Sequence, residues 1–140
     1  MVGLKELKGY LGGELSAQRR FKVGQRRSAV NIRLTLAQAV EIRARIGAAV
    51  RELEPGARVV LYGSQARGDA TPDSDWDVLI LLDGAIDRQR EEALRRRLYA
   101  LALDTDMILT TAIYSRDRWE SADYRVSPLR ASVEREGIAL

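Results

Sequence analysis

The stretch GSQARGDATPDSDWDVLI, residues 63–80, decides the fold of this chain. It directly follows residues 59–62, a short apolar run whose pattern predicts a fully buried strand. Its last residues belong to a second apolar run, 76–82, that predicts another strand. Glycine, aspartate, proline and serine fill the interval between the two runs, and these residue types are typical of loops. The sequence therefore predicts two strands joined by a polar loop that carries the candidate functional groups.

Two carboxylates stand two residues apart where the second predicted strand begins. Because successive side chains of a strand point to opposite faces, Asp75 and Asp77 are expected on one face, roughly 6–7 Å apart along the strand. Two like charges about 5.5 Å apart repel by roughly 3 kcal/mol at an effective dielectric constant near 20. Folding does not require this cost, and a divalent cation bound between the carboxylates removes it. Asp75 and Asp77 are therefore the candidate catalytic and metal-binding residues, for Mg²⁺ or Mn²⁺. Either aspartate alone could simply cap a turn or line a solvated sheet edge.

The residues that leave the first strand form a candidate phosphate site. Gly63 and Ser64 enter a turn of helical type, and backbone N–H groups at such a strand-to-helix junction can bind an anion. Glycine lets a phosphate approach the backbone closely, and the hydroxyl of Ser64 can donate a further hydrogen bond. Arg67 could neutralise charge on departing phosphates, or it could pair with Asp69 or Asp73. Together with the two aspartates, this arrangement suits attack on an α-phosphate with pyrophosphate as the leaving group.

These residues resemble the signature of the polymerase-beta-like nucleotidyltransferase superfamily, in its minimal, single-domain bacterial and archaeal form. The family pattern is Gly-Ser, then Arg-Gly, then Ser-Asp-x-Asp followed by apolar residues. This chain has Gly63-Ser64, Arg67-Gly68 and Ser74-Asp75-Trp76-Asp77. The order of predicted elements over residues 36–114 matches as well, and the resemblance covers roughly residues 35–140. It implies magnesium-dependent nucleotidyl transfer. Ser74 is a further candidate for nucleotide binding, with shaping of the loop as its alternative role.

Active members of this family usually carry a third carboxylate on a neighbouring strand, where it binds metal and can accept a proton from the attacking hydroxyl. The family pattern there is an aspartate followed by apolar residues. Asp106 is followed by Met107, Ile108 and Leu109 and is assigned as the third catalytic and metal-binding residue. Asp104 is the alternative, although Thr105 follows it. If neither aspartate reaches the site, the expected catalysis is slow or absent.

The rest of the sequence predicts the elements that complete the domain. Thr35 is expected to cap a helix over residues 36–53. Its predicted buried stripe consists of Leu36, Val40, Ile46, Ala49, Val50 and Leu53. After the second strand we expect a charged amphipathic helix at 87–103, a strand at 107–114, a short helix at 115–122, a last helix from Ser127-Pro128, and residues 138–140 as an edge strand or packed on the core. These elements predict an α/β or α+β fold with a small mixed sheet covered on one side by helices.

Composition narrows the chemistry that the chain can perform. Its 140 residues, 46% of them hydrophobic, fit one domain, and no apolar run approaches the roughly 20 residues needed to cross a bilayer. The chain has no cysteine and no histidine, which excludes thiol and imidazole catalysis and thiolate zinc sites. Carboxylates, hydroxyls, lysine, arginine and oxygen-bound metal ions remain. The lack of cysteine fits the reducing cytoplasm, which is the expected location.

Positive charge is concentrated near the N-terminus. Residues 1–33 contain 8 Lys or Arg side chains against 2 glutamates, whereas the rest carries 15 basic and 18 acidic residues. Residues 1–34 are therefore expected to form a basic extension ahead of a domain at 35–140. The segment QRRFKVGQRRS within it has little apolar content, which favours mobility. The charge suggests a polyanion such as nucleic acid or an acidic partner protein, or equally a solvated tail.

Three functions remain open from the sequence. The first is transfer of a nucleoside monophosphate, with ATP as the expected donor of AMP, to a hydroxyl group. The resemblance implies that the acceptor lies on a small all-α partner protein of the HEPN type, the pair acting as toxin and antitoxin. The second is a catalytically weak or inactive module that neutralises such a partner by docking. The third is transfer to an RNA end, with the basic extension binding the nucleic acid.

Overall fold

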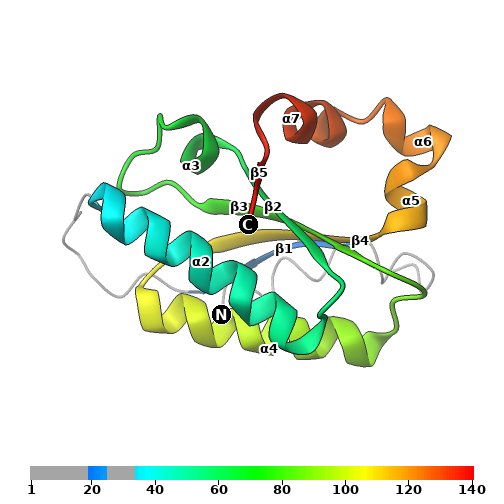
Figure 1. The fold of residues 1–140 in the computed structure, drawn as a ribbon, viewed down its shortest axis with the longest axis horizontal. Helices are drawn as coiled ribbons and strands as arrows, with labels where there is room; N and C mark the ends of the chain where they lie inside the picture. The colour runs from blue at the N-terminus through cyan, green and yellow to red at the C-terminus, as the bar shows by residue number, and fades with distance from the viewer. Residues whose placement is uncertain (1–18, 25–33) are drawn as a thin grey trace.

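The computed structural model describes residues 19–24 and 34–140, and in this part of the chain it contains one sheet of five strands (Figure 1). The strand order across the sheet is β1-β4-β3-β2-β5. The bounds are Arg19–Val23 for β1, Arg58–Tyr62 for β2, Trp76–Leu82 for β3, Leu109–Ser115 for β4 and Ile138–Ala139 for β5. Strands β3 and β4 are parallel, and every other neighbouring pair is antiparallel. The predicted mixed sheet and α/β class are confirmed.

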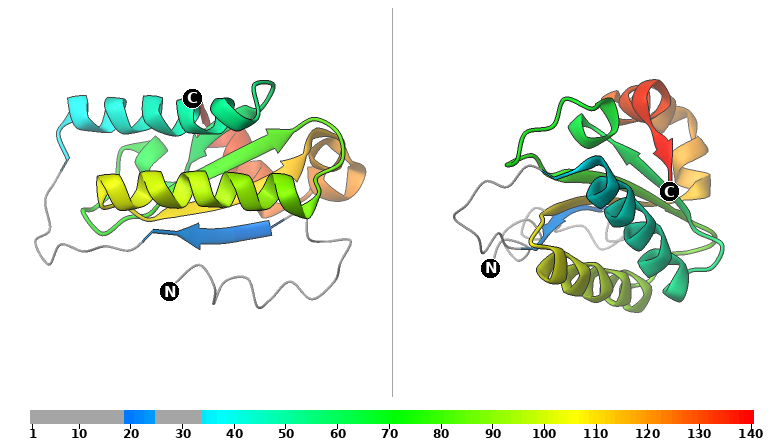
Figure 2. Two further views of the ribbon diagram at one scale, coloured as in Figure 1. Left: turned by 90° about the horizontal axis from the view of Figure 1, so that it is seen from below. Right: turned by 60° about the vertical axis from the view of Figure 1, so that its left-hand side comes forward.

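Helices α2 (Leu36–Leu53) and α4 (Arg88–Thr105) lie side by side across one face of the sheet, in front of it in the left view of Figure 2. Helix α2 begins as predicted, because the hydroxyl of Thr35 accepts a hydrogen bond from the backbone N–H of Gln38, whose side chain accepts one from the N–H of Thr35 in return. Asp87 caps α4 in a similar way through the N–H of Arg90. Helix α4 connects the two parallel strands.

The buried stripe of α2 is shorter than predicted. Ile46, Ala49 and Val50 are buried, as expected, and Ile42 joins them. Leu36, Val40 and Leu53 are exposed instead, and Leu36 is 78% exposed. At the start of the helix, Leu36 lines an open cavity, so much of its apolar side chain remains in contact with solvent.

The opposite face of the sheet is also covered, so the predicted one-sided cover was incomplete. Helices α5 (Arg116–Glu120), α6 (Ala122–Arg125) and α7 (Pro128–Glu136) follow β4, and α7 lies behind the sheet in Figure 2. Trp119 and Val133 pack there on strand residues such as Leu79 and Leu81. The predicted start of α7 is confirmed, because Ser127 caps it and Pro128 is its first residue. The two layers form separate apolar clusters, one on each face of the sheet.

Two boundaries differ from the prediction. Strand β4 begins at Leu109 rather than at residue 107, because α4 continues to Thr105 and ends on a left-handed residue, Asp106. Part of the expected basic extension, Arg19–Val23, is a strand that pairs with β4. Its buried side chains, Phe21 and Val23, belong to the main core, which explains why a segment of low average hydrophobicity is nonetheless ordered. Residues 1–18 and 25–33 lie outside the described residues.

Replacing Trp119 by alanine is expected to destabilise the fold by about 3–5 kcal/mol, because it removes a large buried ring. The Trp119 ring lies 5.7 Å from the ring of Tyr114 and 6.1 Å from that of Tyr124, and the guanidinium of Arg130 lies 5.4 Å above it. Urea unfolding followed by circular dichroism measures the change. As a control, Val126→Ala should alter stability by less than about 0.5 kcal/mol, since Val126 is 85% exposed.

None of the helices within the described ranges is both long and apolar enough to span a membrane.

Candidate active site

The centre of the predicted site is a contact between Gly63 and Asp77. Tyr62, the last residue of β2, pairs with Asp77 in β3, so the residue after it lies directly beside the aspartate. A Cβ atom added to Gly63 would lie 3.1 Å from Cγ of Asp77 and closer still to its Oδ2. The carboxylate of Asp77 therefore rests against the backbone of Gly63, in space that a side chain would otherwise fill. The structure thus brings together the two halves of the motif.

The backbone of Gly63 has a conformation that glycine alone adopts readily. Its φ is 75° and its ψ is −162°, a region in which any other residue is strained by its Cβ. This conformation turns the chain out of β2 and into α3, the short helix Ser64–Arg67. The carbonyl of Gly63 accepts hydrogen bonds from the N–H groups of Ala66 and Arg67, at 3.0 Å each. The predicted turn of helical type is therefore present, and Ser64 is its first residue.

Asp75 lies just before β3 and has two described partners. The hydroxyl of Thr110 donates a hydrogen bond of 3.2 Å to its Oδ2, and the ammonium of Lys22 lies 3.0 Å from the same oxygen. The side chain of Asp75 is 24% exposed and that of Lys22 is 41% exposed, so solvent reaches the ion pair. Neither partner was predicted from the sequence.

The register of the sheet explains why these groups meet. Asp77 in β3 stands beside Thr110 in β4, and Thr110 stands beside Lys22 in β1. Neighbours in register point to the same face of a sheet. Carboxylate, hydroxyl and ammonium therefore follow one another across three strands. No signal in the sequence gives the pairing of β1, whereas Thr110 could have been found by placing the start of β4 correctly.

Ser74 shapes the loop that leads into β3. Its N–H donates to the carbonyl of Thr71 at 3.0 Å, and its hydroxyl oxygen accepts a hydrogen bond from the N–H of Thr71 at 2.9 Å. The two hydroxyl oxygens are 3.2 Å apart. These bonds close the turn one residue ahead of Asp75, which is the alternative role that the sequence left open for Ser74.

Arg67 forms ion pairs with two acidic residues. Its Nη1 lies 2.7 Å from Oε2 of Glu136 in α7, and its Nε lies 3.2 Å from Oδ2 of Asp69. The hydrogen bond to Glu136, followed by that to Asp69, raises the pKa of the Arg67 guanidinium. The carboxylate of Glu136 is itself almost fully buried, so the pair ties α3 to the last helix.

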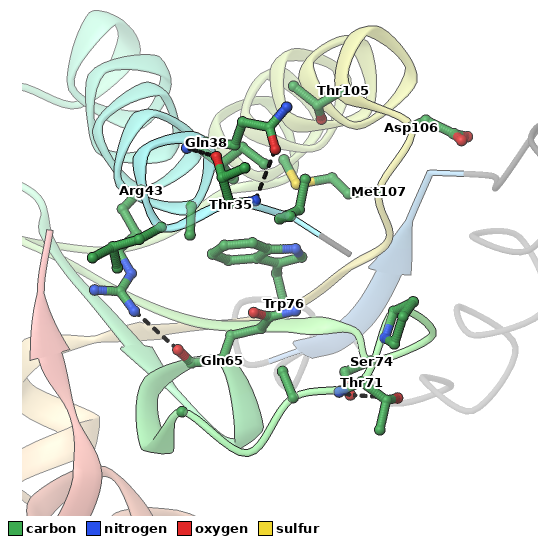
Figure 3. Close-up of a pocket in the computed structure, with 17 residues that line it drawn as sticks. Thr35, Gln38, Arg43, Gln65, Thr71, Ser74, Trp76, Thr105, Asp106 and Met107 are labelled. Atoms are coloured by element: carbon green, nitrogen blue, oxygen red, sulfur yellow. Dashed lines mark hydrogen bonds between the residues drawn. The ribbon is translucent and has the colours of Figure 1, made fainter. Parts of the chain in front are cut away.

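The structure does not bring the expected third carboxylate to the site. Asp106 is the C-cap residue of α4, with a φ of 50°, and it lies before β4 rather than within it. In Figure 3 its carboxyl group points away from Trp76 and Ser74. Asp104 forms an ion pair with Arg45 of α2, and this hydrogen bond lowers the pKa of the Asp104 carboxyl. Across residues 19–24 and 34–140, no three acidic side chains lie close enough together to hold a metal ion.

A cavity of about 550 Å³ opens between the start of α2 and the loop at 68–74 (Figure 3). Trp76 forms its floor, and Asp106 stands at its rim. Arg43 of α2 donates a hydrogen bond of 3.0 Å to the carbonyl of Gln65 and so closes one side. Because Trp76 and Asp77 are adjacent in β3, they point to opposite faces of the sheet. The cavity is therefore separate from the pair of aspartates.

Comparison with known proteins identifies the family of the chain. The nucleotidyltransferase domain family matches residues 44–123, more than half of the chain. The chain therefore belongs to the nucleotidyltransferase domain family, within the polymerase-beta-like superfamily, and the predicted membership is confirmed. Membership indicates general nucleotidyl transfer and a nucleotide substrate. The matched region contains the whole motif, whereas β1 and Lys22 precede it. No curated protein matches the chain.

Members of this family generally use divalent metal ions, and the donor chemistry of the site fits one. Asp75 and Asp77 offer carboxylate oxygens, which are the ligands that Mg²⁺ and Mn²⁺ prefer. Asp77 lies against a glycine and is partly exposed. Among the described residues, Asp75 and Asp77 are therefore the two acidic groups placed to hold the ion, without Asp106 or Asp104.

Proposed function

We propose that this protein transfers a nucleoside monophosphate, with AMP as the expected group, from a nucleoside triphosphate to a hydroxyl, using Mg²⁺ or Mn²⁺ held by Asp75 and Asp77. The observation that carries the proposal is the contact between Asp77 and Gly63. It places the acidic group that would hold metal against the bend that would hold phosphate. Glycine adopts this bend without strain and leaves room for the carboxylate, which is the arrangement that binding of a metal ion together with a phosphate requires.

Each residue of the motif has a role in this proposal. Gly63 and Ser64 bind the outer phosphates through the backbone N–H groups of the bend and the hydroxyl of Ser64. Asp75 and Asp77 would hold the metal ion beside the α-phosphate. When bound, the metal ion supplies charge neutralisation at the phosphates and lowers the pKa of a coordinated hydroxyl. Thr110 positions Asp75 through its hydrogen bond.

Arg67 and Ser74 have less direct roles. For Arg67 to contact phosphate, it must exchange Glu136 or Asp69 for the nucleotide, since both hold its guanidinium in the absence of ligand. Ser74 orders the loop ahead of Asp75 and contacts the nucleotide only if its bond to Thr71 breaks. Asp106 is not proposed as a metal ligand, because it caps α4 outside the site.

The acceptor is proposed to be a tyrosine or another hydroxyl on a helical partner protein of the HEPN type, in a toxin and antitoxin pair of the cytoplasm. The size of the domain supports this proposal. The described elements from residue 36 onward form the sheet and the helices that cover it, which leaves little chain for an acceptor pocket. A partner would therefore supply the acceptor and much of its binding surface.

A second candidate function is a catalytically weak module that neutralises such a partner by docking. The observation that favours it is that, among the described residues, the site contains two carboxylates where active relatives usually have three. With one acid fewer, the attacking hydroxyl lacks the usual proton acceptor, and the transfer step is slowed. Both candidates use the same fold, and only a measurement of transfer distinguishes them.

The test of the proposed function is the fate of two labels on ATP. With Mg²⁺ and a candidate helical partner, the label from α-labelled ATP is expected on the partner, and the label from γ-labelled ATP is expected in pyrophosphate. Both results should disappear when EDTA removes the metal ion. Transfer of the γ-label instead would contradict nucleotidyl transfer, and tight binding to the partner without transfer of any label would favour the docking module.

A parallel reaction with RNA as acceptor separates the remaining alternative. If the basic N-terminal segment binds nucleic acid, labelling of an RNA end should fall steeply as the salt concentration rises, because several phosphate contacts are lost. Labelling of a protein hydroxyl should depend on salt much less.

A further inference from the structure

Beside Asp77 the neighbouring strand, β4, carries the hydroxyl of Thr110, and the next strand, β1, carries the ammonium of Lys22. Thr110 stands in register with Asp77, and Lys22 stands in register with Thr110. A third carboxylate would have to lie on this part of β4 to share a metal ion with Asp75 and Asp77. The chain instead places there a neutral side chain and, one strand further, a positive charge that reaches Asp75 at 3.0 Å.

We propose that Lys22 is a nucleotide-binding residue of this site, and that its ammonium serves as a fixed cation so that the site binds one divalent ion with its nucleotide. The inference rests on the proposed function and names a component of the same site. Lys22 comes from β1, ahead of the part of the chain that matches the family.

The charges at the site favour one divalent ion over two. Asp75 and Asp77 contribute two negative charges, and Lys22 contributes one positive charge at ion-pair distance from Asp75. Three carboxylates can offset most of the charge of two divalent ions. Asp75, Asp77 and Lys22 together have a single net negative charge, which offsets only half the charge of one divalent ion. The phosphates of the nucleotide supply the rest. A second metal ion would have to displace the ammonium of Lys22 from Asp75 and would then lie beside that positive charge.

The chemistry of an ammonium suits phosphate. It is a compact charge that carries three hydrogen-bond donors, and lysine is a common ligand of phosphate groups. The side chain of Lys22 is 41% exposed, so a ligand can reach it from solvent. A nucleotide whose outer phosphates lie at Gly63 and whose α-phosphate lies at the aspartates would bring phosphate oxygens within its reach.

The test measures binding rather than turnover, and it uses the full chain. The probes are α,β-methylene ATP, which cannot be cleaved at the α-phosphate, and Mn²⁺, which is counted by electron paramagnetic resonance. For Lys22→Met, we expect the affinity for the analogue in the presence of EDTA to fall at least about tenfold, as befits the loss of one charge-assisted hydrogen bond. The affinity for Mn²⁺ alone should rise severalfold, because Asp75 loses the cation that competes with the metal ion.

Opposite effects on the two ligands distinguish a binding role from a structural one, since a local distortion of β1 would weaken both. Lys22→Arg, which keeps the charge, should retain analogue affinity within about threefold of the native protein. Arg125→Met removes one positive charge from exposed α6, away from the site, and should change neither affinity. The native protein with the analogue should bind one Mn²⁺ per chain.

The proposal is overturned if Lys22→Met binds the analogue within twofold of the native affinity, or if the native protein takes up two Mn²⁺ per chain with the analogue. The variant Asp77→Asn distinguishes failure of the inference on Lys22 from failure of the proposed active site. If that variant loses Mn²⁺ while Lys22→Met behaves as the native protein does, only the inference on Lys22 is wrong. If Asp77→Asn binds Mn²⁺ and the analogue normally, the proposed active site itself is wrong.

Discussion

Gly63→Ala is expected to lower the rate of nucleotidyl transfer by at least about a hundredfold and to destabilise the fold by about 1–3 kcal/mol. The stability loss follows from the backbone, because φ of 75° with ψ of −162° is strained for every residue except glycine. The rate loss follows from the contact with Asp77. A Cβ would lie 3.1 Å from Cγ of Asp77 and nearer to its Oδ2, so the carboxylate must move. A displacement of about 1 Å at a reacting centre costs about a hundredfold in rate.

Gly84→Ala is the matched control for this variant. Gly84 has a φ of 74°, close to that of Gly63, but the nearest atom to an added Cβ is a flexible arginine nitrogen 4.0 Å away. It follows β3 at the end remote from the aspartates. We expect a stability loss of about 1–2 kcal/mol from the backbone and a transfer rate close to the native one. Equal rates for the two variants would show that Gly63 serves the turn alone.

Asp77→Asn is expected to abolish detectable transfer, with a fall of at least about a hundredfold. Substitutions of residues that merely support a metal ligand typically cost ten- to a hundredfold, so loss of a direct ligand should cost more. Asparagine keeps the shape of the side chain and removes one of two neighbouring negative charges, so stability should change by less than about 0.5 kcal/mol. Steady-state assays with α-labelled ATP measure the rate, and thermal unfolding measures the stability.

The same variant has a signature in ligand-dependent stability. Mn²⁺ with a nucleotide analogue should raise the melting temperature of the native protein, because a ligand that binds only the folded state stabilises it. This increase should be lost in Asp77→Asn and retained in Asp73→Asn, which changes an exposed aspartate of the same loop. A native-like transfer rate in Asp77→Asn would refute its role as a metal ligand.

The motif made much of the fold and half of the site predictable. Gly63 and Asp77 are distant enough in sequence that only the pairing of two strands brings them together, yet both strands are marked by continuous apolar runs. The helix ends were predictable because the capping residues are explicit, as with Thr35 and Gln38 or with Ser127 and Pro128. Residues next to each helix end determine where the helix begins, so a local pattern is enough to predict it.

The predicted third carboxylate, Asp106, lies at the C-terminal end of α4 rather than on the neighbouring strand. The apolar residues after Asp106 resemble the start of a strand, but Met107 and Ile108 still belong to the connection, since the N–H of Met107 bonds back to the carbonyl of Ala102. That bond shifts the start of β4 to Leu109 and places Thr110 beside Asp77. Sequence patterns define strand ends poorly because one hydrogen bond of the preceding helix can move them.

Lys22 could not have been found from the sequence at all. Its strand is five residues long and highly charged, and its place in the sheet depends on pairing with a strand almost ninety positions later, since Lys22 pairs with Thr110. Long-range pairing of this kind leaves no local pattern. The same is true of the ion pair between Arg67 and Glu136, which joins the motif to the last helix of the described chain.

The antiparallel pairing of β1 with β4 has a practical consequence for anyone who shortens this protein. A fragment trimmed to the region that matches the family would begin after Val23 and leave the whole length of β4 as an open sheet margin. Rows of bare amide and carbonyl groups beside apolar residues are templates for self-association. Such a fragment would be prone to precipitate, and its failure in an assay would reveal nothing about the chemistry of the intact molecule.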